Sequence, residues 1–380
     1  MSSNKESANV NSQLDRIANA FGRDNDPLQK HESKFEKLDI DLFEVFVNRV
    51  LVEQGLADST FEDYQRIFGQ WIEFTEKKGR HPACPNEGLV KEYAHYYRDD
   101  VGNNPDTVQK KLKRLNKAYS FWQASNSFPH PKDYNPFESA LMNLDLRSPP
   151  AKDYPYIKKS ELRKRVKDVT HIRDQAIIAS QAKLGLRGGA TANVRIEDLH
   201  INNSQLQRFY PELGSNEMLN GNENAIYIPP KPDTGLPLQG RSGNKSRRPR
   251  ILPLDHELRR LLTRYLLIRP DTGTPWLFLS KQKHNKLNNE AVNNIWIDAF
   301  HPEYEETDQH RGITSHYGRH WFTTYWRIEQ DVNRELIKYM RGDKNNSSLQ
   351  NRRSAIDDYI HIYYEDIEEL YRSQIFSLDL

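Results

Sequence analysis

The stretch Leu184-Gly-Leu-Arg-Gly-Gly-Ala-Thr-Ala-Asn-Val-Arg-Ile-Glu-Asp-Leu199 is the part of this 380-residue sequence that is most informative about its fold. It follows a segment, 173–183, with helical character, and Gly185 is a residue type that often ends a helix. Arg187 comes two residues later. An arginine in this position is usually a surface residue near a helix end, so its meaning depends on residues elsewhere in the chain.

Two later segments carry side chains that could act together with Arg187. They are Ser315-His316-Tyr-Gly-Arg319-His320 and Asp358-Tyr359-Ile-His361. His316 and Arg319 are three residues apart, so on a helix they share a face and could reach one phosphate. Two guanidinium groups, Arg187 and Arg319, could neutralise the non-bridging oxygens of a phosphodiester with bidentate geometry. A tyrosine hydroxyl has a pKa of about 10, so Tyr359 would need nearby cations or a base to act as a nucleophile.

These three segments, in this order, resemble the signature motifs of the tyrosine recombinase, or phage integrase, family, and the resemblance covers roughly residues 40–375. It implies a site-specific DNA recombinase that cuts and rejoins DNA through a 3′-phosphotyrosyl bond and a Holliday junction. Tyr359 would be the nucleophile, and Arg187, Arg319 and His316 would bind the reacting phosphate. His320 is a further candidate.

A basic stretch between the first two motifs supplies a candidate general acid. Ten basic residues against three acidic ones give the stretch a net charge of +7; they are Lys231, Arg241, Lys245, Arg247, Arg248, Arg250, Arg259, Arg260, Arg264 and Arg269, against Asp233, Asp255 and Glu257. The leaving 5′ oxygen needs a proton, which a lysine can supply. In the family this lysine sits in a β-hairpin turn just before a strand, and residues 243–254 resemble that hairpin. We choose Lys245, with Lys231 as the alternative, and expect Arg247 and Arg248 to bind DNA.

The sequence departs from the family pattern at two positions. An acidic residue usually lies three places after the first arginine, where this chain has Ala190, so we expect Glu197 or Asp198 to orient Arg187. The third family motif usually ends in histidine or tryptophan, where this chain has Asp343. An ionised Asp343 could accept a hydrogen bond from Tyr359 or His316 but could not donate one to phosphate. This variation resembles archaeal viral and plasmid integrases.

The first part of the chain is expected to be helical. Residues 1–38 are polar and predict a flexible arm, and residues 39–146 predict a helical domain. Ser59 and Glu62 have the spacing of a capping box. After Asn104-Pro105, apolar residues recur at helical intervals at Val108, Leu112, Leu115, Tyr119 and Trp122, and the remaining faces carry Lys110, Lys111, Lys113, Arg114 and Lys117. We expect Lys110, Lys113, Arg114 and Lys117 to contact DNA, although such a face is more often only solvated.

The proline-rich stretch 147–156 is the predicted linker, and residues 157–380 form the predicted catalytic domain with a C-terminal docking helix. Helical patterns dominate this second part, and the β-prone segments 225–229 and 250–254 predict a small antiparallel ribbon. The predicted fold is therefore mainly α, with a helical (SAM-like) core-binding domain and a mixed, mainly α catalytic domain. Arg341, Arg352 and Arg353 are interpreted as solvated surface charges.

The composition is that of an ordinary folded protein, with 36% hydrophobic and 28% charged residues and a net charge of +2. No apolar run approaches the roughly 18 residues of a membrane span, so we expect a cytoplasmic protein without a membrane partner. Cys84 is the only cysteine and is expected to be an inert or semi-exposed thiol. No ligand cluster with metal-binding spacing and no glycine-rich phosphate loop lies near the motifs, so no metal or other cofactor is expected.

The resemblance implies that double-stranded DNA attachment sites are the partner, held by four protomers that lock together through their C-terminal helices. It also allows a monomer in solution and an accessory directionality factor. Docking of the helix within its own chain is equally compatible with the sequence. Two alternatives remain: a type IB topoisomerase, which uses the same set of residue types, and a DNA-binding protein that has lost its catalysis.

Overall fold

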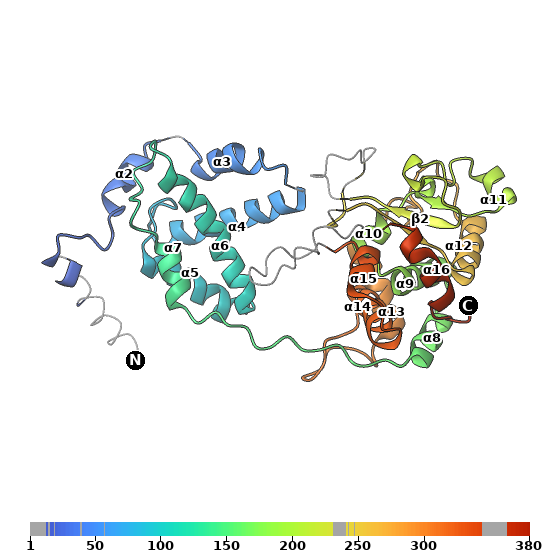
Figure 1. The fold of residues 1–380 in the computed structure, drawn as a ribbon. Helices are drawn as coiled ribbons and strands as arrows, with labels where there is room; N and C mark the ends of the chain where they lie inside the picture. Colours follow the sequence, from blue (N-terminus) through green and yellow to red (C-terminus); the bar gives the residue numbers. More distant parts are fainter. Residues whose placement is uncertain are drawn as a thin grey trace. The chain divides into compact units, whose positions relative to one another are not determined.

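The computed structural model describes residues 13, 16–18, 20–38, 40–56, 58–230, 241, 243–246, 248–343 and 363–380. These residues belong to two compact units, Met1–Ala151 and Lys152–Leu380. The division lies within the stretch 147–156, which the sequence predicts to be a linker. Figure 1 shows the elements of each unit.

The first unit is entirely helical in its described part. Its longer helices are α4 (Asp58–Lys77), α5 (Glu87–His95), α6 (Pro105–Ala124) and α7 (Pro136–Asn143), and shorter turns are η1 (Gln29–His31), α2 (Glu32–Phe35), α3 (Leu42–Phe46) and the π-helices η2 (Val47–Leu51) and η3 (Tyr96–Asp100). Asn104 caps α6 by accepting a hydrogen bond from Asp106 N, with Pro105 in the first turn. Ser59, in the predicted capping box, lies outside the described side chains.

The apolar face predicted for α6 is confirmed, because Val108, Leu112, Leu115, Tyr119 and Trp122 are all buried in the core of this unit. Lys111 is a correction: its side chain is buried rather than part of the basic surface. Its ammonium donates to Gln70 Oε1 at 2.7 Å and lies 3.5 Å from the centroid of the Tyr97 ring. Burial lowers the pKa of Lys111 to about 8.

The predicted flexible arm, residues 1–38, includes a C-terminal part that is packed against the first unit. Leu28 and Phe35 are buried in the core, and Arg80 forms ion pairs with Asp26 and Glu32 at 2.8 and 2.7 Å. Few apolar residues mark this segment, so its packing is visible only in three dimensions. Cys84 is likewise fully buried rather than semi-exposed, and burial raises the pKa of its thiol to about 12.

The second unit has a helical core with a small sheet, which confirms the predicted fold class. Its helices are α8 (Lys159–Asp168), α9 (Ile172–Leu184), α10 (Gly188–Ala192), α11 (Ser204–Phe209), α12 (His256–Ile268), α13 (Asn289–Phe300), α14 (Ser315–Thr324), α15 (Arg334–Arg341) and α16 (Glu365–Gln374). Short turns are η4 (Ile196–Asp198), η5 (Glu217–Leu219) and the π-helix η7 (Tyr325–Glu329).

The sheet has the order β1-β2-β3 and is antiparallel throughout. Strands β2 (Ala225–Ile228) and β3 (Arg250–Pro253) form the predicted ribbon, with Ile226 opposite Leu252. The additional strand β1 (Leu199–His200) has two residues, too few for an alternating pattern to reveal it.

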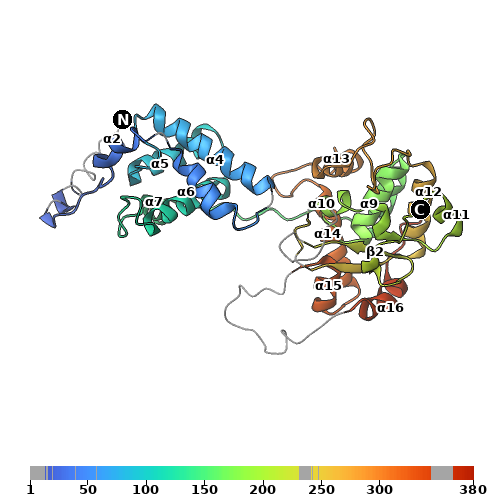
Figure 2. The ribbon, with the colours of Figure 1, turned by 90° about the horizontal axis from the view of Figure 1, so that it is seen from above.

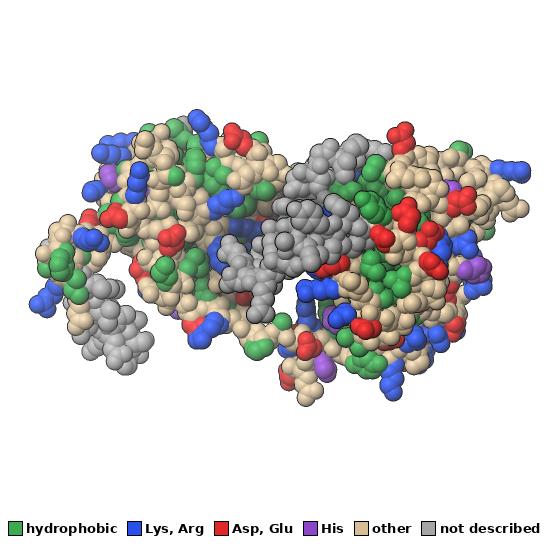
Figure 3. All heavy atoms as spheres, in the orientation of Figure 1, with side chains coloured by type: hydrophobic (Ala, Val, Ile, Leu, Met, Phe, Trp, Pro, Cys, Tyr) green, Lys and Arg blue, Asp and Glu red, His purple; other side chains and the backbone are tan. Residues whose placement is uncertain are grey.

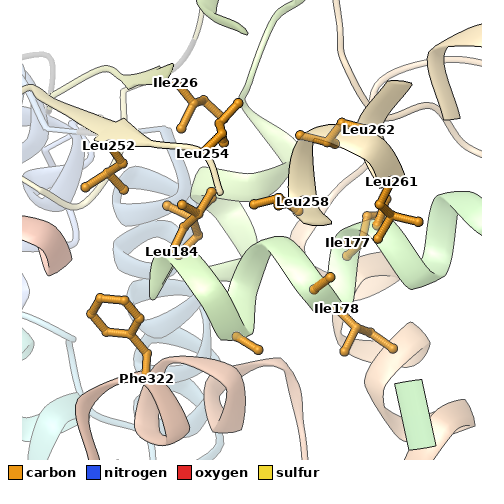
Figure 4. Packing of buried hydrophobic residues seen from close by; sticks show 14 of the residues in the cluster. Ile177, Ile178, Leu184, Ile226, Leu252, Leu254, Leu258, Leu261, Leu262 and Phe322 are labelled. Atoms are coloured by element: carbon orange, nitrogen blue, oxygen red, sulfur yellow. The ribbon is translucent and has the colours of Figure 1, made fainter. Parts of the chain in front are cut away.

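Helix α9 is the centre of this unit. Its buried side chains, Ile177, Ile178 and Leu184, belong to one apolar cluster (Figure 4). The cluster also contains Leu258, Leu261 and Leu262 of α12, Ile226 and Leu252 of the sheet, and Phe322 of α14. Helices α15 and α16 lie next to each other below the sheet in Figure 2, on the opposite side from α13. This packing fixes the C-terminal ends of α9 and α15 relative to the middle of α14.

The C-terminal helix docks on its own chain. Ile367 and Tyr371 of α16 are buried, as are Phe376 and Leu378 after it, and Tyr371 Oη donates to the carbonyl of Lys183 at 2.9 Å. Glu365 and Glu369 of this helix are exposed, and Glu368 pairs with Arg372 at 2.9 Å. Figure 3 shows acidic side chains on the surface of this unit. Docking within its own chain, one of the two arrangements that the sequence leaves open, is therefore the arrangement in this single chain.

Candidate active site

Arg187 is positioned by the turn between α9 and α10. Gly185 ends α9 with a φ of 63°, and its N–H donates to the carbonyl of Gln181 at 2.9 Å. A Cβ atom at this position would lie 2.7 Å from Cδ1 of Phe322, so the turn requires glycine for both its conformation and its packing. Arg187 is the residue before α10, and its side chain is one-third exposed.

Arg319 reaches the same place from α14. Its side chain is only 1% exposed. Its Nη1 donates to the carbonyls of Gly185 at 2.7 Å and Arg341 at 2.8 Å, and its Nη2 contacts Asp343. Arg187 Nη2 lies 3.1 Å from the same oxygen, Oδ1 of Asp343. The structure therefore brings Arg187 and Arg319 together at Asp343.

Asp343 is the partner of both arginines, which corrects the expectation that Glu197 or Asp198 orients Arg187. Glu197 and Asp198 do not orient Arg187, because these carboxylates hold Arg195 and Arg241 instead. The described partners of Asp343 are Arg187, Arg319 and Arg341 rather than His316, and Tyr359, the other candidate donor, lies outside the described residues. Asp343 follows Gly342, whose φ of 65° ends α15; a Cβ there would collide with the Arg250 guanidinium and with Ser246 Oγ.

Arg341 is a site residue that the sequence did not reveal. Its Nε lies 3.0 Å from Oδ2 of Asp343, the oxygen that Arg187 and Arg319 leave free, and its side chain is 27% exposed. The interpretation of Arg341 as a solvated surface charge is therefore wrong. Arg341 lies two residues before Asp343, which replaces the histidine or tryptophan usual in the third family motif. This position in the motif is the feature of the sequence that could have indicated a role for Arg341.

The histidines of α14 have different surroundings. His316 is exposed; partial desolvation and then the charges of Arg319 and Arg187 lower its pKa. It shares a helix face with Arg319. His320 contacts aromatic rings, at 5.2 Å from Tyr154 and 6.3 Å from Tyr317 between ring centroids. His316 is thus the better placed of the two for chemistry beside the arginines.

Lys245 lies on the same cavity as the arginines. This cavity, of about 700 Å³, is lined by Arg187, Lys245, Thr323, Arg327, Arg334, Ile337, Lys338, Arg341, Gly342 and Asp343. Ser246, next to Lys245, donates its hydroxyl to the carbonyl of Gly342 at 2.8 Å. Lys231 and Arg247 lie outside the described residues, and Arg248 is exposed. The wall of the cavity is strongly cationic, with Asp343 as its only acidic residue in the described part of the chain.

The basic stretch 231–269 is less available to a partner than its charge suggests. Arg250 and Arg269 are buried and donate to backbone carbonyls, Arg250 to Met340 and Arg269 to residues 270–277. Arg241 is buried against Asp198, whose pKa burial raises. These three arginines stabilise the unit, so their part of the net charge of +7 does not lie at the surface, whereas Lys245, Arg248, Arg260 and Arg264 are exposed.

The basic residues proposed to bind DNA in the first unit also differ in their exposure and in their contacts. Lys110 and Lys113 are exposed, and Lys113 Nζ lies 2.9 Å from Gln109 Oε1. Arg114 pairs with Asp63 at 2.9 Å, and Lys117 donates to Gln54 Oε1 at 2.9 Å. Exposure therefore favours Lys110 and Lys113 over the half-buried Arg114 and Lys117 as groups that phosphate could reach.

Tyr359 lies outside the described residues, but two of the neighbouring tyrosines have structural roles. Tyr364 is buried, with its hydroxyl 3.1 Å from Glu368, and Tyr371 is buried against Lys183. Burial raises the pKa of both hydroxyls, so neither ionises readily. Tyr363 is exposed.

In the described part of the chain, no group of three or more His, Cys, Asp and Glu side chains could hold a metal ion. Among the same residues, no helix is both long and apolar enough to cross a membrane.

Comparison with solved structures identifies the fold. No family model and no curated protein matches the sequence. The Tn1549 transposon integrase in complex with a circular intermediate DNA is 15% identical, with a TM-score of 0.56, covering 86% of this chain and 97% of the integrase. The lambda integrase dimer bound to a COC' core site is 10% identical, with a TM-score of 0.56 and coverage of 80% and 92%.

A lambda integrase tetramer bound to a Holliday junction is also similar, at 10% identity and a TM-score of 0.55, covering 89% of this chain and 88% of that chain. These likenesses extend over both units. The chain therefore has the fold of the tyrosine recombinases.

Proposed function

We propose that this chain is a site-specific DNA recombinase that cuts one strand of DNA with Tyr359 and rejoins it to another. The observation that carries the proposal is the meeting of Arg187 and Arg319 at Asp343, on a cationic cavity that Lys245 also lines. A wall of this kind suits a phosphodiester, whose negative oxygens guanidinium groups bind with fixed geometry.

The reaction follows from these groups. The Tyr359 oxygen attacks the phosphorus, a P–O bond to tyrosine forms, and the P–O5′ bond breaks. Arg187, Arg319 and Arg341 would stabilise the charge on the non-bridging oxygens. His316 would take the tyrosine proton, and Lys245 would give a proton to the leaving 5′ oxygen. The 3′-phosphotyrosyl bond conserves the energy of the broken bond, so rejoining by another 5′ hydroxyl needs no nucleotide.

The partner in this proposal is double-stranded DNA bound mainly through its backbone. Structural neighbours include an integrase on a circular intermediate DNA and a tetramer on a Holliday junction, which supports four protomers exchanging strands on two sites. Lys110, Lys113 and Arg248 are exposed candidates for phosphate contacts, so binding should weaken as salt rises. A viral or plasmid source and an accessory directionality factor remain part of the proposal.

A covalent trap tests the function and recovers the DNA site in the same experiment. The full-length protein is incubated with a library of nicked duplexes, whose short cleaved strand diffuses away so that rejoining fails. Denatured complexes are recovered, the DNA is sequenced, and the attached peptide is identified by mass spectrometry. A nucleotide-linked peptide containing Tyr359, absent from Tyr359→Phe, is expected. Adducts on Tyr363, or none with any duplex, would exclude the proposal.

Relaxation of a supercoiled plasmid distinguishes the recombinase from a type IB topoisomerase. The plasmid should lack the sequence recovered by the trap. A recombinase needs a partner site, so we expect little relaxation and efficient exchange between two cloned copies of the recovered sequence. Fast relaxation without exchange would instead assign a topoisomerase.

A further inference from the structure

The C-terminal turn of α15 is held at three successive carbonyls by side chains from different parts of the chain. Arg250 Nε donates to Met340 O at 2.9 Å, Arg319 Nη1 to Arg341 O at 2.8 Å, and Ser246 Oγ to Gly342 O at 2.8 Å. The last carbonyls of a helix lack partners within it, and cations near them are favourable. These contacts make the turn 340–343 a fixed point rather than a frayed helix end.

Asp343 is the next residue after this fixed point, and it shares its two oxygens among three guanidinium groups. Oδ1 contacts Arg187 and Arg319, and Oδ2 contacts Arg341. One negative charge opposes three positive ones, so the cluster keeps a net positive charge and can still take an anion. Without the carboxylate, the three guanidiniums would repel one another at short range.

The same turn is linked to the candidate general acid. The Ser246 hydroxyl has two acceptors for its one proton, Gly342 O at 2.8 Å and Arg248 O at 2.9 Å, and it accepts the Arg248 N–H at 3.4 Å. These contacts fix the backbone on the C-terminal side of Lys245. Lys245 itself is exposed and lines the cavity. A single turn of chain therefore contacts both the arginines and the loop of the lysine.

We propose that the turn 340–343 is the positioning element of the site: Asp343 holds Arg187, Arg319 and Arg341 together, and the Gly342 carbonyl holds Ser246 and thereby Lys245. This inference rests on the proposed function. Asp343 and Ser246 are positioning residues, because each acts through another side chain. The turn thus positions both the arginines that would bind the phosphate and the lysine that would protonate the leaving group.

Two variants separate these two roles. Asp343→Asn keeps the shape of the side chain but removes its charge. Because misplaced groups lower the rate rather than the binding, we expect strand cleavage to slow about 100-fold. We expect DNA affinity to stay within about 3-fold, since the cluster becomes more positive. Ser246→Ala should slow cleavage about 10-fold by loosening Lys245.

A substrate with sulfur in place of the bridging 5′ oxygen provides the decisive readout. A thiolate leaves without protonation, so a defect in the general acid disappears with this substrate. Ser246→Ala should then cleave at the wild-type rate, while Asp343→Asn should remain slow. Asp331→Asn is the matched control, because Asp331 pairs with Arg327 of the same cavity at 3.2 Å but is 92% exposed. It should cleave normally.

The outcomes are distinct from those of the function itself. Wild-type protein that forms no Tyr359 adduct would end the proposed function. If wild type reacts but Asp343→Asn cleaves as fast or faster, Asp343 is an occupant that phosphate displaces, and the positioning role is overturned. If Ser246→Ala is equally slow with both leaving groups, or normal with both, the link to Lys245 is overturned. Ser246→Ala is a mild change, so the comparison of the two leaving groups in this variant still tests the proposal even if Asp343→Asn does not fold.

Discussion

Lys183 Nζ lies 2.8 Å from Glu257 Oε2 in the interior of the second unit, and this pair holds the end of the chain in place. The Lys183 side chain is fully buried. Glu257 also accepts hydrogen bonds from the backbone N–H groups of Leu378 and Leu380, at 2.8 and 2.7 Å. The C-terminal residues are therefore attached to α9 and α12 of their own chain.

Glu257→Gln should release this C-terminal segment. The change leaves Lys183 buried with Asp255 as its remaining carboxylate partner, 2.7 Å away, and a loss of about 3 kcal/mol in the free energy of unfolding is expected. Hydrogen exchange of residues 365–380 should accelerate in the variant. Glu369→Gln, on the exposed face of α16, is the control and should change neither quantity. Unchanged exchange in Glu257→Gln would show that apolar packing alone retains the tail.

Gly342→Ala should damage both stability and cleavage. The positive φ disfavours alanine, and its Cβ would collide with Arg250 and Ser246, so we expect a loss of about 3 kcal/mol. Gly273 has a similar φ of 63° with open space around it, so Gly273→Ala should cost only about 1 kcal/mol and cleave normally. Thermal unfolding and the trapping assay check both variants. Equal costs would mean that Arg250 and Ser246 move aside freely.

The buried lysine of α6 should behave differently from its exposed neighbours. Replacing Lys110 and Lys113 together by alanine should weaken DNA binding and lower the slope of log affinity against log salt by about 2. Lys111→Met should leave affinity and slope unchanged, because the ammonium contacts Gln70 and Tyr97 instead of solvent. Fluorescence anisotropy across a salt series measures both. A slope that changes in Lys111→Met but not in the double variant would reverse this assignment.

The first unit should lose stability in mild acid because of His130. Its Nε2 lies 2.8 Å from Ala83 O, it is 5% exposed, and burial lowers its pKa from 6.5 to about 4. The unfolded chain therefore binds the proton of this histidine more tightly than the folded chain does. The stability that neutral His130 gives the folded unit is complete above pH 6.5 and is lost as the pH falls toward 4. Its full size is about 3 kcal/mol.

Hydrogen exchange of α6 in the full-length protein, followed between pH 7 and 4, measures this loss. His130→Gln removes the titrating group, so its stability should fall less steeply with acid than that of the wild type. Parallel pH profiles for the two proteins would assign the acid sensitivity to other groups.

Arg341→Gln should slow strand cleavage about 100-fold with little change in DNA affinity, because it removes one donor to the charge that develops on the phosphate. Arg327→Gln is the comparison, since Arg327 lines the same cavity but pairs with exposed Asp331. It should affect binding more than cleavage. Single-turnover rates with the trapped substrate distinguish the two effects, and a wild-type rate for Arg341→Gln would remove it from the site.

Much of the fold was predictable because local patterns are strong where one helix face is buried. The spacing of Val108, Leu112, Leu115, Tyr119 and Trp122 predicted α6, and the β-branched residues of β2 and β3 predicted the ribbon. Two-residue β1 and the packed segment around Leu28 were missed, because too few residues carry the pattern. Lys111 was misassigned since burial of a lysine depends on partners from other helices.

The sequence by itself determined the order of the motifs and the residue types in them, and hence the choice of Arg187, His316, Arg319, Lys245 and Tyr359 as candidates. It could not determine which acid orients the arginines, because hydrogen-bond partners far apart in the chain leave no periodic signal. Only the tertiary structure showed that the C-terminal ends of α9 and α15 meet at Arg319, in the middle of α14. There Asp343 takes the contacts expected of Glu197 or Asp198, and Arg341 joins the site, because packing around α9 fixes where those helix ends meet.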